Sequence, residues 1–165
     1  MRVNPAIFRA YDIRGVFPDE ISGQTAYLLA RAFVVYLRES QSTEPLRIVV
    51  AHDARPSSQE LKKGVLRGLL EEGVLAIDMG FATTPFHAFT VIHEGVEGGL
   101  MITASHNPCH INGLKLVLKG GGPVGDDMEI IKRIALRGIF SVGAGSGGRV
   151  EMRSPYHEYV DFLLS

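Results

Sequence analysis

A loop crowded with reactive side chains separates two apolar stretches of this 165-residue chain. The apolar stretches, residues 100–102 and 114–118, have the length of buried strands, and the loop between them reads SHNPCHING, residues 105–113. The Asn-Pro and Asn-Gly pairs are turn signals. Ser105 therefore follows a strand directly, on a turn whose backbone amides can point outward and bind an anion. The pattern favours phosphate chemistry at this serine.

Two other kinds of site are possible at the same loop. His106, Cys109 and His110 could bind zinc, but a closed zinc site needs four ligands, and no other histidine has a spacing that nominates the fourth. A serine hydrolase needs a base within hydrogen-bond reach of Ser105, and we expect the adjacent side chains of Ser105 and His106 to point apart. The sequence also lacks a GxSxG elbow around Ser105.

Basic residues near other predicted turns could complete a phosphate site. Lys115 lies just past the serine loop, Arg14 lies in FRAYDIRG near another strand end, and Arg55 lies in the turn before a predicted helix N-terminus. Helix N-termini bind phosphate groups readily. Each residue alone is more typical of a surface ion pair, so only their combination supports the phosphate interpretation.

A glycine-rich stretch near the C-terminus matches GxGxxG at Gly143, Gly145 and Gly148. A dinucleotide site needs a strand before this motif and a helix that begins inside it. The segment before it is predicted to be helical, so we interpret the stretch as a linker.

Apolar periodicity and turn signals predict helices that alternate with strands. The predicted helices cover residues 22–40, 57–73, 84–94 and 126–138, and the strands cover 47–53, 74–80 and 98–105, followed by the strand after the serine loop. Ser57 and Glu60 have the spacing of a capping box for the second helix. The alternation predicts an α/β fold with a mixed, mostly parallel sheet of about four strands flanked by helices.

Composition limits the classes of partner. Hydrophobic residues make up 45% and charged residues 21%, with a formal net charge of -1, which is typical of a globular domain and gives no electrostatic case for nucleic acid or a membrane surface. The single cysteine, Cys109, excludes an intrachain disulfide, and no apolar run resembles a signal peptide. We therefore expect a cytoplasmic protein without a membrane span.

Four motifs together resemble the N-terminal domain of the α-D-phosphohexomutases, the phosphomannomutase and phosphoglucomutase family. They are FRAYDIRG (8–15), DARPSS (53–58), TTP (83–85) and TASHNPCHINGLK (103–115). The resemblance runs over essentially the entire chain in the family's order. It implies a three-layer α/β sandwich and an intramolecular phosphotransferase that interconverts hexose 1-phosphate and hexose 6-phosphate, of mannose or glucose, through a bisphosphate.

The resemblance also implies residue roles. Ser105 matches the serine that carries the phosphoryl group and gives one oxygen ligand to Mg²⁺ through that phosphate. Lys115 matches the general acid/base lysine, Arg14 the arginine that lines the reaction centre, and His106 the histidine beside the phosphoserine. Tyr11 falls in the same N-terminal motif as Arg14, so Tyr11, Arg14 and Lys115 are the expected substrate contacts. Hexose 1,6-bisphosphate is the expected activator.

The family has four domains, and this chain has the length of one. We expect residues 1–140 to form the phosphoserine domain, 141–154 a Gly-rich linker, and 155–165 the start of a truncated second-domain helix. The remaining Mg²⁺ ligands and the sugar-binding loops would come from further mutase domains, in cis or in trans, so the chain alone should be inactive. The alternative is a catalytically silent domain that binds sugar phosphates or a partner through the apolar face of its last helix.

Overall fold

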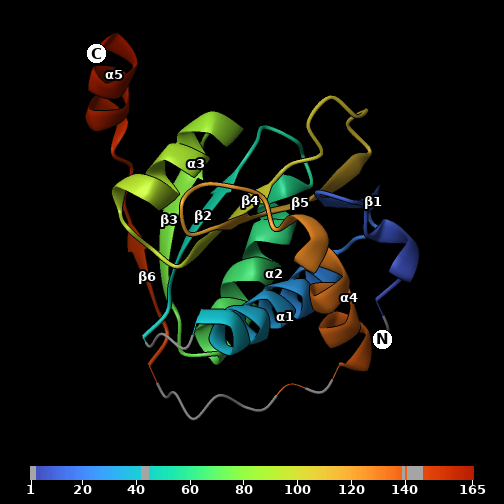
Figure 1. Ribbon diagram of the computed structural model, residues 1–165. Coiled ribbons are helices and arrows are strands. Elements are labelled where there is room, and N and C mark those ends of the chain that lie inside the picture. Colours follow the sequence, from blue (N-terminus) through green and yellow to red (C-terminus); the bar gives the residue numbers. More distant parts are fainter. Residues whose placement is uncertain (1–2, 42–44, 139, 141–146) are drawn as a thin grey trace.

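A single mixed sheet forms the centre of the computed structural model, which describes residues 3–41, 45–138, 140 and 147–165 (Figure 1). Its strand order is β1-β5-β4-β2-β3-β6. The strands are β1 (Ile13–Val16), β2 (Arg47–His52), β3 (Leu75–Phe81), β4 (Gly98–Ile102), β5 (Ile111–Leu118) and β6 (Arg149–Met152). β5 is antiparallel to both of its neighbours, β1 and β4, and all other pairs are parallel. The sheet is therefore mostly parallel, as the sequence predicts.

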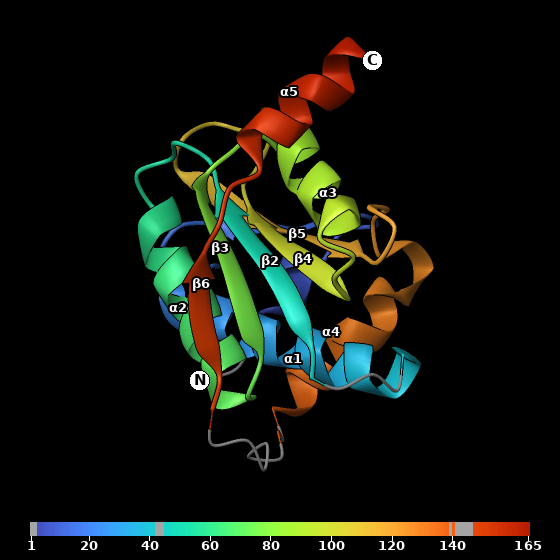
Figure 2. The ribbon, with the colours of Figure 1, turned by 90° about the vertical axis from the view of Figure 1, so that its left-hand side faces the viewer.

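Helices cover both faces of this sheet. α1 (Gly23–Gln41), α2 (Ser58–Glu71) and α4 (Met128–Arg137) pack on one face, and α3 (Thr84–His93) packs on the other (Figure 2). Two short 3-10 turns, η1 (Pro5–Ile7) and η2 (Gly125–Asp127), precede β1 and α4. The last helix, α5 (Tyr156–Leu164), contacts α3 and extends away from the sheet. The predicted three-layer α/β architecture is confirmed.

Two apolar layers hold these elements together. The larger one joins the sheet to α1, α2 and α4 and contains Phe33 and Leu100, both fully buried. The smaller one lies under α3 and contains Val49, Met101 and Phe86. No helix in the described part of the chain has both the length and the apolar character needed to span a bilayer.

The sheet has six strands where the sequence predicted about four. The two additional strands, β1 and β6, lie at the two edges of the sheet and have only four residues each. Neither has a long apolar run, and all four residues of β6 are exposed, so backbone pairing rather than side-chain burial defines them. β6 also falls within the predicted linker 141–154, which is therefore wrong for Arg149–Met152; residues 141–146 lie outside the described residues.

The predicted capping box at α2 does not form. Ser57 occupies the N-cap position but makes no side-chain cap hydrogen bond. Its hydroxyl oxygen instead accepts a hydrogen bond from the Asn112 side chain on β5, at 2.8 Å. By contrast, Thr83 caps α3 by accepting from the Phe86 amide. The start of α2 is thus tied to the sheet at the point where the serine loop ends.

Candidate functional site

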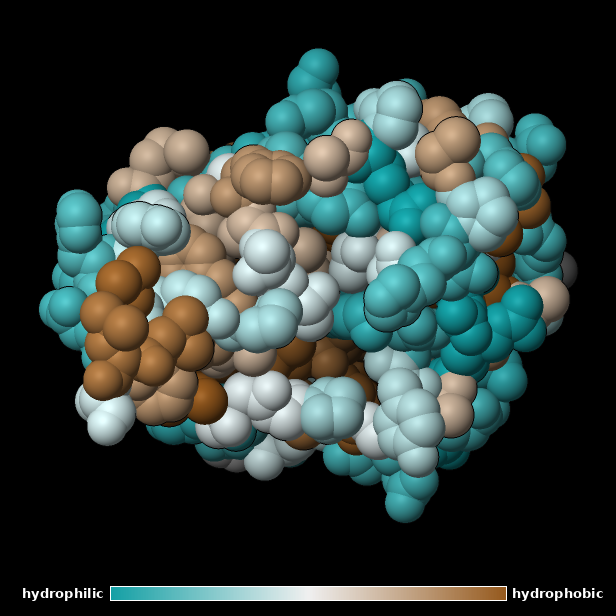
Figure 3. Space-filling model, turned by 90° about the horizontal axis from the view of Figure 1, so that it is seen from above, coloured by the Kyte–Doolittle hydropathy of each residue, from teal (hydrophilic) through white to brown (hydrophobic). Residues whose placement is uncertain are grey.

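The carboxyl ends of the parallel strands form one edge of the sheet. The chain leaves β2 toward α2 on one face and leaves β3 toward α3 on the other, and ligands of open α/β sheets bind at this kind of divergence. An open hollow of about 540 Å³ lies here, and Figure 3 looks down on this edge. Its lining includes Asp53, Arg55, Thr83, Met101, Thr103 and Cys109.

Ser105 lies beside this hollow, three residues after the end of β4. Its φ angle is +57°, a left-handed conformation that costs a non-glycine residue roughly 1–2 kcal/mol. The Ser105 amide donates to Thr103 Oγ1 at 2.9 Å, and the side chain is exposed. A serine is therefore held in an unfavourable backbone conformation with its hydroxyl in solvent.

The His106 ring lies closer to Ser105 than the sequence predicted. Its Nδ1 is 3.3 Å from Ser105 Oγ, so the expectation that these adjacent side chains point apart is wrong. A hydrolytic triad would need a third group to orient the imidazole. No side chain in the described residues bonds the other ring nitrogen of His106, so this pair can exchange a proton but is not a triad.

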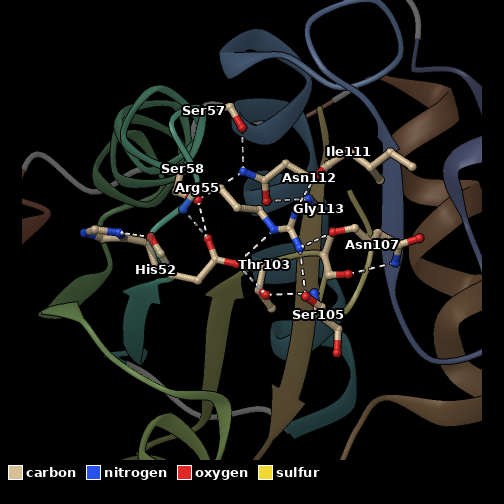
Figure 4. A network of polar contacts seen from close by, with 12 residues as sticks. His52, Arg55, Ser57, Ser58, Thr103, Ser105, Asn107, Ile111, Asn112 and Gly113 are labelled. Atoms are coloured by element: carbon tan, nitrogen blue, oxygen red, sulfur yellow. Dashed lines mark hydrogen bonds and ion pairs between the residues drawn. The ribbon is translucent and has the colours of Figure 1, made fainter. Parts of the chain in front are cut away.

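The Arg55 guanidinium binds the backbone of the serine loop and is not free to bind a phosphate. Its guanidinium is largely buried, with 11% of the side chain exposed, and its Nε donates to Asp53 Oδ2 at 3.0 Å. Its two Nη atoms donate to four backbone carbonyl oxygens of the loop (Figure 4). These belong to Ser105 at 2.7 Å, Asn107 at 2.8 Å, Pro108 at 2.7 Å and Ile111 at 3.0 Å. The predicted phosphate contact by Arg55 is therefore wrong.

Asp53 holds the Arg55 side chain in place through its carboxylate. Its carboxylate accepts hydrogen bonds from the Ser58 and Thr103 hydroxyls, both at 2.7 Å, and from the Arg55 amide at 3.0 Å. Burial raises the pKa of Asp53, but the hydrogen bonds from Ser58, Thr103 and Arg55 outweigh it and hold the pKa below its usual value. The carboxylate is thus charged and fully engaged.

A second buried contact joins β5 to the start of α2. Asn112 is fully buried and donates to the Ser57 and Ser58 hydroxyls, while its oxygen accepts from the Gly113 amide at 2.8 Å. His52, at the end of β2, has Nδ1 2.8 Å from the Asp53 carbonyl oxygen. The Asn112 contacts fix the end of the serine loop, as Figure 4 shows.

Strand register places Arg14 and Lys115 on one face of the sheet. Arg14 on β1 is opposite Gly113, and Lys115, two residues farther along β5, is opposite Met101 on β4. Residues two apart on a strand share a face, so Arg14 and Lys115 are neighbours on the α3 side. Lys115 lies on the strand that follows the Ser105 loop, and Arg14 lies on the strand beside it.

The two cations differ in their partners. Arg14 exposes 39% of its side chain and lies 3.5 Å from the Asp12 carboxylate. Lys115 is half-buried, and no hydrogen bond or ion pair engages its amine within the described part of the chain. Tyr11, in the bend before β1, exposes 66% of its surface. Within the described residues, Arg14 therefore has an anionic partner and Lys115 has none.

The described residues do not by themselves complete a magnesium site. Among the described residues, no three His, Cys, Asp or Glu side chains come close enough to hold a metal ion, and this applies also to the zinc alternative at Cys109. The Asp53 carboxylate beside the loop is engaged by Ser58, Thr103 and Arg55. Mg²⁺ is typically bound by carboxylates, phosphate and water, and the described residues bring together no such set of carboxylates.

Sequence reasoning missed the polar network beneath the loop. The motifs contain Asp53, Thr103 and Asn112, but the sequence predicts no role for them. The available signal was their position, because a buried asparagine in an apolar strand must find hydrogen-bond partners.

The chain matches the family profile "Phosphoglucomutase/phosphomannomutase, alpha/beta/alpha domain I" over residues 5–140. It is 38% identical over 160 residues to a phosphomannomutase of Escherichia coli, covering 95% of this chain and 34% of that protein. The chain thus spans about a third of that relative. A phosphomannomutase of Klebsiella pneumoniae is 37% identical over 157 residues, and there the match covers 93% of this chain and 96% of the other.

A solved structure agrees with these matches. A phosphoglucomutase/phosphomannomutase family protein of Burkholderia thailandensis superposes with a TM-score of 0.83 at 32% identity, covering 96% of this chain and 35% of that one. The shared sheet, the serine loop and the extent of the match lead to one conclusion. The chain belongs to the phosphoglucomutase/phosphomannomutase family and comprises its α/β/α domain I.

Proposed function

We propose that this chain is the phosphoserine domain of a phosphohexomutase that interconverts hexose 1-phosphate and hexose 6-phosphate. The observation that carries the proposal is the exposed Ser105 hydroxyl in a left-handed turn, on a loop whose ends are fixed by Arg55 and Asn112. Phosphoryl transfer depends mainly on positioning and positive charge. The rigidly held hydroxyl supplies the positioning, and Arg14 would supply the positive charge.

The proposed phosphoryl transfer consists of two successive displacements at phosphorus. A hydroxyl of the bound hexose monophosphate attacks the Ser105 phosphoryl group, so that the Oγ–P bond breaks and a hexose bisphosphate forms. Lys115 is the base that takes the hydroxyl proton, while Arg14 binds the phosphoryl oxygens and Tyr11 contacts the sugar. The bisphosphate then turns, and Ser105 Oγ attacks its other phosphorus, so that the P–O bond to the sugar breaks. The isomeric hexose monophosphate leaves with the proton that Lys115 had taken. His106 Nδ1, 3.3 Å from Oγ, gives Oγ a proton when the first Oγ–P bond breaks and takes it back when Oγ attacks.

Magnesium would neutralise charge on the phosphoryl group during this transfer. This chain would contribute one ligand, an oxygen of the Ser105 phosphate. The remaining ligands would belong to a domain beyond the chain, in cis or in trans, and hexose 1,6-bisphosphate would supply the first phosphoryl group. On this proposal the isolated chain has no mutase activity.

The test joins the chain to the part of the E. coli phosphomannomutase that lies outside the match. We expect this reconstituted enzyme to interconvert mannose 1-phosphate or glucose 1-phosphate with the 6-phosphate, and its intact mass to show one phosphoryl group on Ser105 after incubation with the bisphosphate. Ser105→Ala should lose both properties, whereas His157→Gln, an exposed change on α5, should keep them. Undiminished mutase activity in the Ser105→Ala enzyme would refute the assignment.

A further inference from the structure

We propose that Arg55 is a positioning residue for phosphoryl transfer, which shapes the serine loop into an anion-binding surface without touching the substrate. The inference rests on the proposed role of Ser105. One guanidinium binds carbonyl oxygens from the start of the loop, at Ser105, to its end, at Ile111. The loop is thereby closed around a single side chain.

This arrangement determines where the loop amides point. The C=O and N–H of a trans peptide point in opposite directions. Because the Ser105 carbonyl faces Arg55, the His106 amide faces away from it, and the Pro108 carbonyl turns the Cys109 amide away in the same manner. Neither amide donates to another atom in the described ranges. Figure 4 shows the Ser105 side chain pointing away from Arg55 as well. Two unpaired amides therefore share the outward side of the loop with the hydroxyl that would carry the phosphate.

The geometry requires an arginine rather than any cation. A guanidinium presents five N–H donors in a rigid plane, and here the structure uses Nε for Asp53 and both Nη atoms for the four carbonyl oxygens. A lysine keeps the charge but has three donors on a flexible stem. Arg55→Lys therefore separates a hydrogen-bonding role from a purely electrostatic one.

The first experiment measures loop order in the 165-residue chain by NMR. In the wild type we expect backbone order parameters of about 0.85 for residues 104–110, and in Arg55→Lys values below about 0.6. Arg133→Lys, an exposed change on α4, should leave the loop unchanged. Retained order in Arg55→Lys would overturn the proposal, whatever the activity of the enzyme.

The second experiment measures kinetics in the reconstituted enzyme. Arg55→Lys should lower kcat about 100-fold, as expected for a misplaced reacting group, and leave KM for the hexose phosphate unchanged. A raised KM with wild-type kcat would instead mean that Arg55 binds substrate, and it would overturn the positioning role. An inactive wild-type reconstituted enzyme would count against the proposed function only. The NMR measurement tests separately whether Arg55 orders the loop.

A third measurement needs no substitution and covers the case in which Arg55→Lys fails to fold. Four hydrogen bonds should stop rotation of the Arg55 Nη groups, so their protons should give separate resonances in the wild-type chain. The exposed Arg133 should give averaged signals. Averaged signals from Arg55 would overturn the proposal.

Discussion

At the residue scale, His87 is a fully buried histidine with one unsatisfied ring nitrogen. It lies on α3, where Nε2 is 3.2 Å from the carbonyl oxygen of Val49, and Nδ1 has no hydrogen-bond partner among the described residues. Burial lowers the pKa of His87 from 6.5 to about 4, and the contact with Val49 offsets only part of this effect. The folded protein therefore holds a neutral imidazole that the unfolded chain would protonate.

We predict that the domain loses stability as the pH falls from 6.5 toward 4. In that window the unfolded state binds a proton that the folded state does not, so the free energy of unfolding falls by on the order of 3 kcal/mol. Above pH 6.5 both states are neutral and the effect disappears. Urea unfolding at pH 7 and pH 4.5 measures it.

The matched variants are His87→Leu and His157→Gln. His87→Leu should flatten this pH dependence, even if its stability at pH 7 is lower, because the titrating group is gone. His157 is exposed on α5, so His157→Gln should keep the wild-type slope. An unchanged slope in His87→Leu would assign the dependence to other groups.

Single residues also show how far sequence reasoning reaches at the site. Ser105 and His106 stand out because their types and turn context suggest chemistry. The purpose of Arg55 was misjudged, since a basic residue before a helix looks like an anion contact until its acceptors are known. Those acceptors are backbone carbonyls up to 56 residues away. The direction in which a backbone carbonyl points cannot be inferred from the types of the side chains.

At the element scale, the contact between α1 and α2 depends on glycine. A Cβ on Gly64 of α2 would overlap the carbonyl oxygen of Gly23 at the start of α1, and a Cβ on Gly68 would lie 2.7 Å from the Tyr27 carbonyl oxygen. Both glycines are buried in the helix interface. The close approach of the two backbones sets the distance at which α2 presents Ser57 and Ser58 to the loop.

Gly64→Ala should therefore destabilise the domain, against the usual preference of helices for alanine. Alanine gains about 1 kcal/mol over glycine in a helix interior, but overpacking of a tight contact costs about 1–3 kcal/mol, and here the clash is with backbone that cannot rotate away. Thermal unfolding should show a lower Tm. Lys63→Ala, an exposed change one residue earlier, should leave Tm close to the wild-type value. A higher Tm in Gly64→Ala would show that the helices separate at little cost.

The elements predicted correctly are those with a strong apolar pattern. The helix predicted for residues 22–40 is observed at Gly23–Gln41, because its apolar stripe is long and faces one core. β6 was not predicted, and the strand expected near Arg14 was given no bounds. Each is four residues long and is held by ladder hydrogen bonds that any sequence can make. The Ser57 cap failed for a related reason, since Asn112 competes for the same hydroxyl from a distant strand.

At the scale of the whole molecule, α5 presents an uncovered apolar surface. Its inner side packs on α3, where Tyr159 stacks on Phe86 at a centroid distance of 4.8 Å. Toward its end the helix exposes Leu163 by 62% and Leu164 by 81%, and Phe162, whose ring contacts Phe89 of α3, is still exposed by 60%. Figure 3 shows apolar side chains gathered at one end of this face. Surfaces of this kind usually mark contacts with another chain or domain.

We predict that the chain associates with itself through the outer side of α5 when no further domain covers it. Sizing chromatography at increasing concentration should show a shift from monomer to dimer. Leu163→Glu should keep the protein monomeric and leave Tm unchanged, because that side chain contributes little to the core. Asp161→Asn, an exposed polar change on the same helix, should still dimerise. The reconstituted enzyme distinguishes two occupants of this surface: if the added domains cover α5, the dimer should disappear there, whereas a dimer that persists would favour the alternative of a domain that binds a separate partner through this helix.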